Sequence, residues 1–249
     1  MRNLEVNNLS KVYGSKVLFS ALNNISFSVD EGEFVGVMGP SGSGKTTLLN
    51  MISTVDKPSS GEIRIRDKNP LKLMGEKLAL FRRRELGFVF QDFNLLDTLT
   101  VGENIVLPLT LDGIPVKTQD EELKRISSIL GIEDLINKRT YEISGGQAQR
   151  TAIARALVHK PTLLLADEPT GNLDSKAAKT VMELFEKINN TEKVTTIMVT
   201  HDPLSASYCN RILFIKDGAI YNEIYKGDSR QQFYQEIMDV LALLGGGNQ

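Results

Sequence analysis

The chain of 249 residues contains one cysteine, Cys209, so it can form neither an internal disulfide nor a zinc site built from cysteines. Its 29 basic residues do not outnumber its 31 acidic ones, and a net charge of −2 gives no overall attraction to nucleic acid or anionic lipid. No run of about 18 apolar residues is present, and no signal peptide opens the chain. We therefore expect a chain that neither crosses a membrane nor binds nucleic acid, in a reducing compartment.

The composition is that of an ordinary globular protein, with 41% hydrophobic and 24% charged residues. This length suits one large domain, or one domain with a subdomain. One local basic cluster stands out, Arg82, Arg83 and Arg84. It is either a solvated helix face or a binding patch, and the sequence leaves both open.

The first third of the chain is rich in predicted strands, over residues 4–12, 25–29, 33–38 and 61–65. In the second of these, Ile25, Phe27 and Val29 alternate with polar residues, which is the period of a half-buried strand. We expect a mixed sheet beside a parallel core.

A helical insertion follows a short strand at 86–90 and extends to about residue 138. Thr118 and Glu121 have the spacing of a capping box, which predicts a helix start there. After a predicted helix at 145–158, apolar strands at 162–166 and 194–199 are typical of a buried parallel sheet. Asp217 and Gly218 then predict a hairpin turn, and an apolar stripe of helical spacing from residue 230 predicts a C-terminal amphipathic helix followed by a frayed glycine tail.

The most informative stretch has the pattern G-x-x-x-x-G-K-T and lies between a predicted buried strand and a predicted helix. Glycines allow several backbone N–H groups to point at one anion, and the helix start adds its positive dipole end. The lysine reaches the β- and γ-phosphates, and the threonine hydroxyl binds Mg²⁺. The alternative is a simple Gly/Ser turn. The predicted nucleotide-binding residues are Gly39, Pro40, Ser41, Gly42, Ser43, Gly44, Lys45, Thr46 and Thr47.

Four further polar residues follow predicted strands, where ligand sites form in parallel sheets. Asp167 is placed to hold Mg²⁺, and Glu168 to orient or deprotonate an attacking water. His201 could hydrogen-bond the γ-phosphate, and Gln91 offers an oxygen to the metal or the water. Each has a structural alternative, since an Asp-Glu pair can simply begin a helix. Their order after the 39–46 loop favours a common site.

A second anion site is predicted where a serine precedes two glycines at a helix start. A chain that already holds a phosphate loop has no internal need for another. We therefore expect this site to cover nucleotide that is bound by a second copy of the chain. Its residues are Ser144, Gly145, Gly146 and Gln147.

Together these motifs make the sequence similar to the ATP-binding cassette (ABC) ATPases over essentially its whole length, with the loop at 171–174 as a further match. The resemblance implies an α/β fold of the P-loop NTPase class, with a mixed RecA-like core sheet, an antiparallel β subdomain and a helical subdomain at about 92–158. It also implies an ATP-binding domain at 1–228, with 229–249 as the C-terminal helix and tail. Ile143 departs from the commoner leucine, with little expected consequence.

The same resemblance implies that ATP and Mg²⁺ are bound between two copies arranged head to tail, that Tyr13 stacks on adenine, and that Thr46, Gln91 and Asp167 hold the metal. Lys45, Gln91, Glu168 and His201 are then the catalytic groups. An integral-membrane permease is the expected partner, docked at residues 93–99, which places the chain at the cytoplasmic face of the membrane.

The amino-acid sequences of the loops resemble most those of the lipoprotein-release and macrolide-efflux branch. Within that branch they resemble bacitracin-type transporters for antimicrobial-peptide resistance. A sensor histidine kinase is a further expected partner, through the permease. The alternatives are a lipoprotein-release or macrolide-efflux ATPase, a cell-division regulator and, with less support, an iron–sulfur assembly ATPase. No N-K-x-D motif for guanine is present, which argues against a GTPase.

Overall fold

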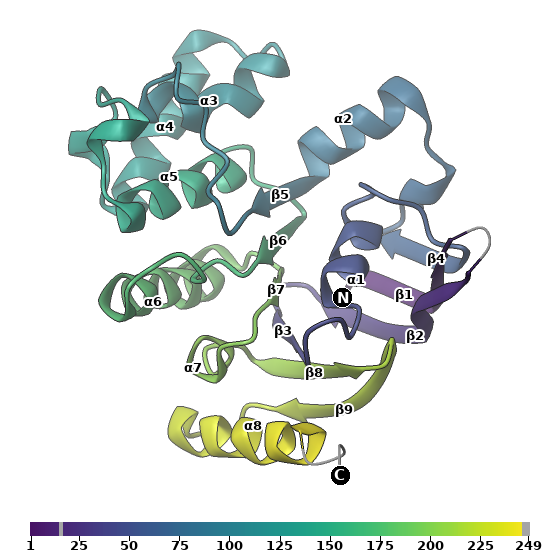
Figure 1. Cartoon of the computed structure of the whole chain (residues 1–249). Coiled ribbons are helices and arrows are strands. Elements are labelled where there is room, and N and C mark those ends of the chain that lie inside the picture. The colour runs from purple at the N-terminus through teal and green to yellow at the C-terminus, as the bar shows by residue number, and fades with distance from the viewer. Residues whose placement is uncertain (15–16, 246–249) are drawn as a thin grey trace.

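The computed structural model describes residues 1–14 and 17–245 (Figure 1). The predicted tail at 246–249 and part of a turn predicted at 13–15 lie outside these residues. The strands are β1 Arg2–Tyr13, β2 Phe19–Asp30, β3 Phe34–Met38, β4 Ser60–Ile65, β5 Leu86–Val89, β6 Leu163–Asp167, β7 Thr196–Val199, β8 Arg211–Lys216 and β9 Ala219–Tyr225. The α-helices are α1 Lys45–Ile52, α2 Gly75–Glu85, α3 Val101–Leu111, α4 Val116–Leu130, α5 Gly145–Leu157, α6 Ser175–Glu192, α7 Pro203–Ala206 and α8 Arg230–Gly245.

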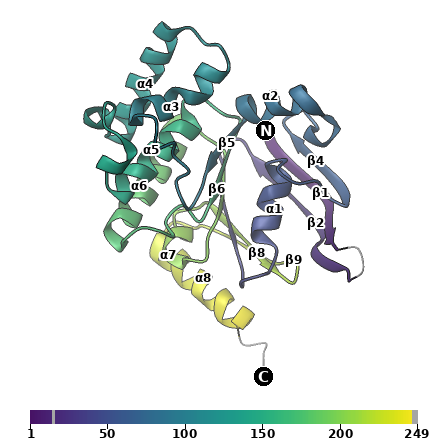
Figure 2. The ribbon, with the colours of Figure 1, turned by 45° about the horizontal axis from the view of Figure 1, so that its top comes forward.

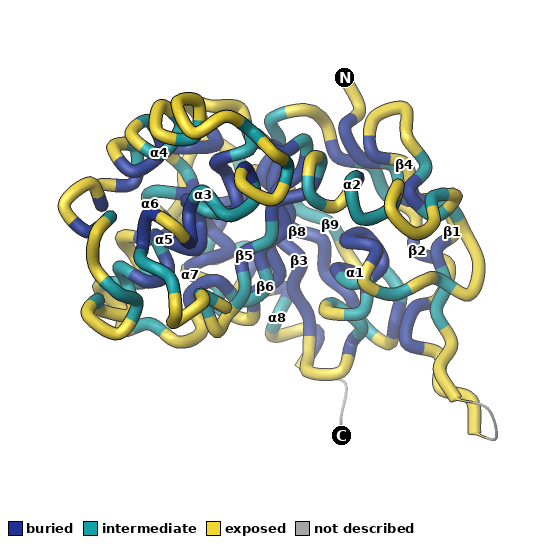
Figure 3. The backbone as a smooth tube through the Cα atoms, turned by 90° about the horizontal axis from the view of Figure 1, so that it is seen from above, coloured by how far each residue is buried: buried dark blue, intermediate teal, exposed yellow. Residues whose placement is uncertain are grey.

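The core sheet has the strand order β5-β6-β7-β3-β8-β9, parallel except for the antiparallel hairpin of β8 and β9. Its strands are apolar on both faces because helices cover one side and the second sheet with α1 covers the other (Figure 3). In β6, Leu164 and Ala166 join the core under α5 and α6, whereas Leu163 and Leu165 join the core facing the other way. Because these apolar strands are buried on both faces, the carboxyl ends of β3, β6 and β7 are fixed at one edge of the core sheet.

The second sheet is antiparallel, with the order β2-β1-β4. The predicted alternation is present, since Ile25 and Val29 are buried and Phe27 is packed partly buried beside them. This sheet and the helical group of α3, α4 and α5 lie on opposite sides of the core sheet (Figure 2). The predicted fold of mixed core sheet, antiparallel β subdomain and helical subdomain is confirmed.

The helical group differs from the prediction at its caps. The helix α4 begins at Val116 with Pro115 as its N-cap, and the Pro115 carbonyl accepts a hydrogen bond from the Thr118 amide at 2.9 Å. Thr118 therefore lies inside the helix, and the predicted capping box with Glu121 is wrong. The capping box instead begins α3, where the Thr100 side chain accepts a hydrogen bond from the Glu103 amide.

The basic cluster on α2 makes contacts within the chain. Arg83 donates to the Leu111 carbonyl at 2.6 Å, and Arg84 pairs with Asp112 at 2.9 Å. Arg82 donates to the Thr54 carbonyl at 3.3 Å. The cluster therefore ties α2 to the end of α3 and to the loop after α1, rather than forming a uniformly solvated face.

The C-terminal helix α8 packs on its own chain, against α7 and β9 (Figure 1). Phe233, Ile237, Val240 and Leu244 are buried and Leu241 packs partly buried against the same core, so the predicted stripe is present with Val240 added. The Arg230 guanidinium lies 4.3 Å from the Tyr208 ring centroid, which fixes the start of the helix beside α7. No helix within the described residues is long and apolar enough to cross a membrane.

Candidate active site

The 39–46 loop joins β3 to α1 at the edge of the core sheet where the parallel strands end. Gly39 has a φ of 151° and Gly44 a φ of 105°. A Cβ at Gly44 would lie 2.5 Å from the Ala21 carbonyl oxygen, so a larger residue cannot fit. Gly44 is also the N-cap of α1 and offers no capping side chain. The first amides of α1 are therefore available to an anion in the loop.

Lys45 extends across this loop. Its Nζ donates to the carbonyl oxygens of Gly39 and Pro40, both at 2.9 Å. Burial lowers the pKa of Lys45, and the negative charges of Glu168 and Asp167 oppose that shift. The sensitivity of Lys45 to both carboxylates means that the loop and the end of β6 belong to one electrostatic site.

Asp167 is the last residue of β6, and its strand pairs with β7 up to Val199. Burial raises the pKa of Asp167, the Glu168 charge raises it further, and Lys45 lowers it. Its Oδ1 is buried and has no hydrogen-bond partner among the described residues. A buried carboxylate oxygen without a partner fits a hard cation, so the residues present suit Mg²⁺.

Glu168 and His201 lie against each other at the ends of β6 and β7. Glu168 Oε2 is 2.9 Å from His201 Nδ1 and accepts a hydrogen bond from the His201 amide at 3.3 Å. The imidazole is largely exposed, whereas the carboxylate is mostly covered. Glu168 has a φ of 47°, an unfavourable value for a residue with a side chain. The pair can act on a group that approaches from solvent.

Gln91 follows β5 but is turned toward the 171–174 loop. Its Nε2 donates to Asn172 Oδ1 at 3.2 Å, and Asn172 in turn donates to Asp92 at 2.7 Å. A Cβ at Gly171 would lie 2.9 Å from the Gln91 amide, so glycine allows this close approach. The structure thus joins Gln91 to the 171–174 loop, which immediately follows the Glu168 segment.

The 144–147 segment forms the start of α5 as predicted. The Ser144 hydroxyl accepts a hydrogen bond from the Gln147 amide at 3.3 Å, and Gln147 Oε1 accepts one from the Ser144 amide at 2.9 Å. The segment opens onto a cavity of about 380 Å³ that is also lined by Arg150 and Lys176. Of the described residues, none from the 39–46 loop lines this cavity. One copy of the chain therefore keeps the two predicted phosphate sites apart.

Comparison with known proteins decides the family. An ABC transporter family model matches residues 22–171. The chain belongs to the ABC transporter family of ATP-binding proteins. The ABC transporter ATP-binding protein YxdL of Bacillus subtilis (strain 168) is 63% identical over 243 residues, 98% of this chain and 95% of that protein. Bacitracin export ATP-binding protein BceA of Halalkalibacterium halodurans is 50% identical over 245 residues, 98% of this chain and 97% of that protein.

Among solved structures, the dimeric structure of MJ0796, a bacterial ABC transporter cassette, has a TM-score of 0.81 and 41% sequence identity. The match covers 90% of this chain and 99% of that one. The related curated protein MJ0796 comes from Methanocaldococcus jannaschii. Fold and family therefore agree, and the chain is an ABC ATPase that binds ATP.

In this ABC ATPase, Tyr13 lies at the end of β1 and is held by two neighbours that the sequence analysis missed. Its hydroxyl donates to Asp56 Oδ2 at 2.9 Å, and Lys11 Nζ lies 4.6 Å from the ring centroid. Burial and the Asp56 carboxylate raise the pKa of Tyr13. Lys11 covers part of the ring, and more than a third of Tyr13 remains exposed. The sequence could have indicated the Lys11 contact, since Lys11 and Tyr13 are two residues apart on one strand and therefore share a face.

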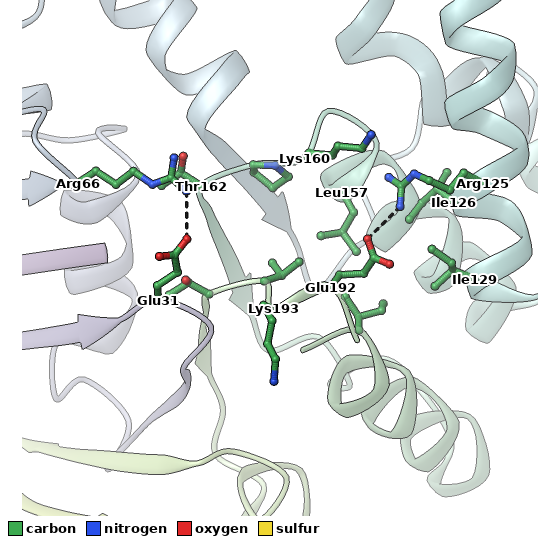
Figure 4. Close-up of a pocket in the computed structure, with 14 residues that line it drawn as sticks. Glu31, Arg66, Arg125, Ile126, Ile129, Leu157, Lys160, Thr162, Glu192 and Lys193 are labelled. Atoms are coloured by element: carbon green, nitrogen blue, oxygen red, sulfur yellow. Dashed lines mark hydrogen bonds and ion pairs between the residues drawn. The ribbon is translucent and has the colours of Figure 1, made fainter. Parts of the chain in front are cut away.

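A different cavity, of about 270 Å³, lies at the opposite edge of the core sheet (Figure 4). Thr162 and Thr195 line it just before β6 and β7 begin, so it faces the amino ends of the strands. Its rim carries the ion pairs Arg125–Glu192 at 3.2 Å and Arg66–Glu31 at 3.6 Å. None of the predicted site residues lines it, and it belongs to the junction of the subdomains rather than to the nucleotide site.

Proposed function

We propose that this ABC ATPase works as a pair of identical subunits that close around two ATP molecules and drive a separate integral-membrane permease from the cytoplasmic face of the membrane. The observation that carries the proposal is the grouping of Lys45, Asp167, Glu168 and His201 at one edge of the core sheet. Within this proposal, residues 1–228 form the ATP-binding domain, and 229–249 add the C-terminal helix and tail.

The proposed hydrolysis gives one role to each group of the candidate site. The 39–46 loop and Lys45 bind the β- and γ-phosphates. Thr46, Gln91 and Asp167 would hold Mg²⁺, which neutralises charge on the phosphates. Glu168 orients the attacking water and accepts its proton, and His201 hydrogen-bonds the γ-phosphate. The contact between Glu168 and His201 supports a shared task for these two residues.

The proposed pairing is head to tail. The 144–147 segment of one copy would cover the nucleotide held by the 39–46 loop of the other. Its separation from that loop within one chain supports this arrangement, as does the dimeric structure of MJ0796. ATP bound between the two copies then stabilises the dimer, and hydrolysis allows the copies to separate.

The permease is proposed to dock in a groove of about 460 Å³ between α2, α3 and α5. The groove is mainly apolar, with Phe88 and Phe90 stacked at a centroid distance of 4.1 Å. Of the stretch 93–99 expected from the sequence, only Asn94 lines this groove. Arg155 donates to the Phe93 and Asn94 carbonyls, so α5 holds the segment after Gln91 at the groove. Movement of a docked helix would thereby reach Gln91.

Antimicrobial-peptide resistance is the proposed process, with peptides of the bacitracin or lantibiotic kind and a sensor kinase reached through the permease. Support comes from the sequence at 96–101, 198–203, 206–209 and 230–233 and from the 50% identity to a bacitracin export protein. The second candidate, lipoprotein release or macrolide efflux, is supported by the sequence at 90–96, 103–105, 107–109 and 167–174, which the two candidates share. Loss of the gene should sensitise cells to bacitracin-like peptides, and unchanged sensitivity to them favours the second candidate.

The central test is Glu168→Gln. This substitution keeps the size of the side chain and removes the base, so hydrolysis should fall by roughly 100-fold, the range of a lost general base. ATP should then trap the protein as a dimer in size-exclusion chromatography. Normal turnover in the variant would remove Glu168 from the proposed role. Adding the permease that co-purifies from membranes should stimulate the unmodified protein, and an unchanged rate would reject coupling.

A further inference from the structure

The two loops that carry Glu168 and His201 leave the sheet side by side. The last contact of the strand ladder joins the Glu168 amide to the Val199 carbonyl at 2.9 Å. Beyond that bond, the segment 169–171 and the short helix α7 are no longer part of the sheet. Another interaction must hold the loops in register, because flexible loops would not keep a carboxylate against an imidazole.

A buried pair of hydroxyl groups provides that interaction. Thr170 Oγ1 and Ser205 Oγ are 3.1 Å apart, and the two residues are only 8% and 2% exposed. Thr170 lies two positions after Glu168, and Ser205 four positions after His201. The contact therefore crosses between the two loops just behind the residues that would act on ATP.

The Ser205 hydroxyl has two polar contacts but only one proton, and this fixes which partner donates in each hydrogen bond. Ser205 Oγ is 2.6 Å from Asp202 Oδ2, and a hydroxyl has one proton to donate. Ser205 therefore donates to the carboxylate and accepts from Thr170. Asp202 also accepts hydrogen bonds from the amides of Leu204 and Ser205, so its side chain is fixed at the start of α7. The chain from Thr170 through Ser205 to Asp202 ends on a charge, which strengthens each link.

The backbone beside this chain of hydrogen bonds is strained. Glu168 has a φ of 47°, which residues with a side chain adopt only when their surroundings impose it. The strand ladder holds Glu168 on one side, and Thr170 is anchored on the other. The Pro169 carbonyl between them accepts a hydrogen bond from Gln149 Nε2 at 2.6 Å. Loss of the Thr170 anchor would give the strained residue freedom to relax.

We infer that Thr170, Ser205 and Asp202 form a brace that positions Glu168 against His201. Thr170 and Ser205 are positioning residues, because their buried hydroxyls contact each other behind the pair and act through it. The inference rests on the proposed function, in which Glu168 and His201 act on the water and the γ-phosphate. It adds α7 to the machinery of hydrolysis and explains why a helix of only four residues is capped so completely.

Ser205→Ala tests the brace in the intact chain. The variant leaves the Thr170 hydroxyl buried without an acceptor, and kcat for ATP hydrolysis should fall about tenfold because small losses of alignment are costly. KM for ATP should stay within about twofold, because the loop and Lys45 are untouched. Ser207→Ala is the matched control. Ser207 is equally buried, but its hydroxyl donates to the Leu204 carbonyl within the same segment.

A second pair of variants approaches the brace from its other end. Thr170→Val keeps the shape and removes the hydroxyl, whereas Thr170→Ser keeps the hydroxyl. The brace predicts a loss of kcat in Thr170→Val and near-normal turnover in Thr170→Ser, and this pair decides the question if Ser205→Ala does not fold. In a Glu168→Gln background, Ser205→Ala should cause little further loss, because its effect passes through the Glu168 carboxylate.

The outcomes separate the brace from the proposed function. If Glu168→Gln abolishes turnover but Ser205→Ala matches Ser207→Ala, the brace is rejected and the catalytic role of Glu168 stands. Equal kcat in Thr170→Val and Thr170→Ser also rejects it, as does a full independent loss in the Glu168→Gln background. If Glu168→Gln turns over normally, the proposed function itself fails.

Discussion

The two predicted phosphate sites of this chain are both helix starts, yet they are built differently. At α1 the N-cap is Gly44, which offers no side chain, so the loop and the first amides are left for a ligand. At α5 the N-cap is Ser144, and Ser144 and Gln147 satisfy each other through a complete capping box. Lysine and carboxylates surround the first site, and a surface cavity surrounds the second.

This difference agrees with the separate tasks proposed for the two segments. The 39–46 loop has free backbone donors at Gly44 and a cation, Lys45, in one place, so we expect it to bind ATP without the second segment. The 144–147 segment is stable without a ligand and has no catalytic carboxylate beside it. We therefore expect it to contact phosphate only when another copy brings nucleotide to it. A variant at the first site should therefore abolish binding, and one at the second should abolish only the closed dimer.

Lys45→Ala should produce the largest effect. Removal of the ammonium leaves the phosphates without their main cation, and ATP affinity should fall roughly 100-fold or more, the range for loss of one partner of a covered charge pair. Titration calorimetry with ATP measures this directly. Lys45→Arg, which keeps the charge, should lose less. Unchanged affinity in Lys45→Ala would contradict the assignment of the 39–46 loop as the ATP site.

Asp167→Asn should lower turnover by a similar order while making the protein more stable. The fold raises the pKa of Asp167, mainly by burial, so the folded protein disfavours the ionised carboxylate. Stability contributed by this group is present below its unfolded pKa and is lost as pH rises through the raised value. Without nucleotide at pH 7.5, the variant should melt roughly 2–4 °C higher, the shift that about 1 kcal/mol produces at this size.

The control for this prediction is pH. The difference in melting temperature between Asp167→Asn and the unmodified protein should shrink as pH falls, because protonation of Asp167 then makes the unmodified protein as uncharged at this position as the variant. A difference that is constant between pH 4 and 8, or a variant that melts lower at pH 7.5, would show that burial of Asp167 carries no cost.

Short motifs were enough to propose a candidate site, because each lies within one turn or one strand end. The 39–46 loop, the Asp167–Glu168 pair and the 144–147 segment need only local geometry and the rule that parallel strands end at one edge. The helix caps show where this fails. The pattern T-x-x-E occurs at Thr100 and again at Thr118. Only the first begins a helix, because Pro115 starts the second helix earlier.

Contacts between distant segments account for what the sequence could not predict. Tyr13 was identified without Asp56, which comes from the loop after α1 and approaches it only in the folded chain. The orientation of Gln91 toward Asn172 likewise depends on how β5 and β6 pair. The groove differs from the predicted stretch 93–99 for the same reason, since α2, α3 and α5 supply most of its wall.

Ser144→Ala should have an intermediate effect that is confined to the second site. The variant loses the hydroxyl that caps α5, which costs about 1 kcal/mol of stability. It should also lower ATP turnover about tenfold, as expected for one lost phosphate donor in trans. ATP binding to the single subunit should not change, because the 39–46 loop lies elsewhere.

Thr100→Ala provides the matched control for the cap. It removes the hydroxyl from a capping box of the same kind at α3, away from both phosphate sites. The two variants should lose similar stability in urea, and only Ser144→Ala should lose turnover. Equal turnover in the two would mean that Ser144 is a helix cap and nothing more.

The smallest expected effect concerns recognition of the adenine ring of ATP rather than of its phosphates. Tyr13→Ala removes the stacking surface, and ATP affinity should fall about tenfold, as for other stacked bases. Tyr13→Phe keeps the ring and loses only the hydrogen bond to Asp56, so affinity should fall about twofold, within the range of one neutral hydrogen bond. Inorganic triphosphate should bind all three proteins equally, because it contacts only the loop. A weaker affinity for triphosphate in Tyr13→Ala would show that Tyr13 supports the 39–46 loop itself, and the distinction between base and phosphate recognition would then fail.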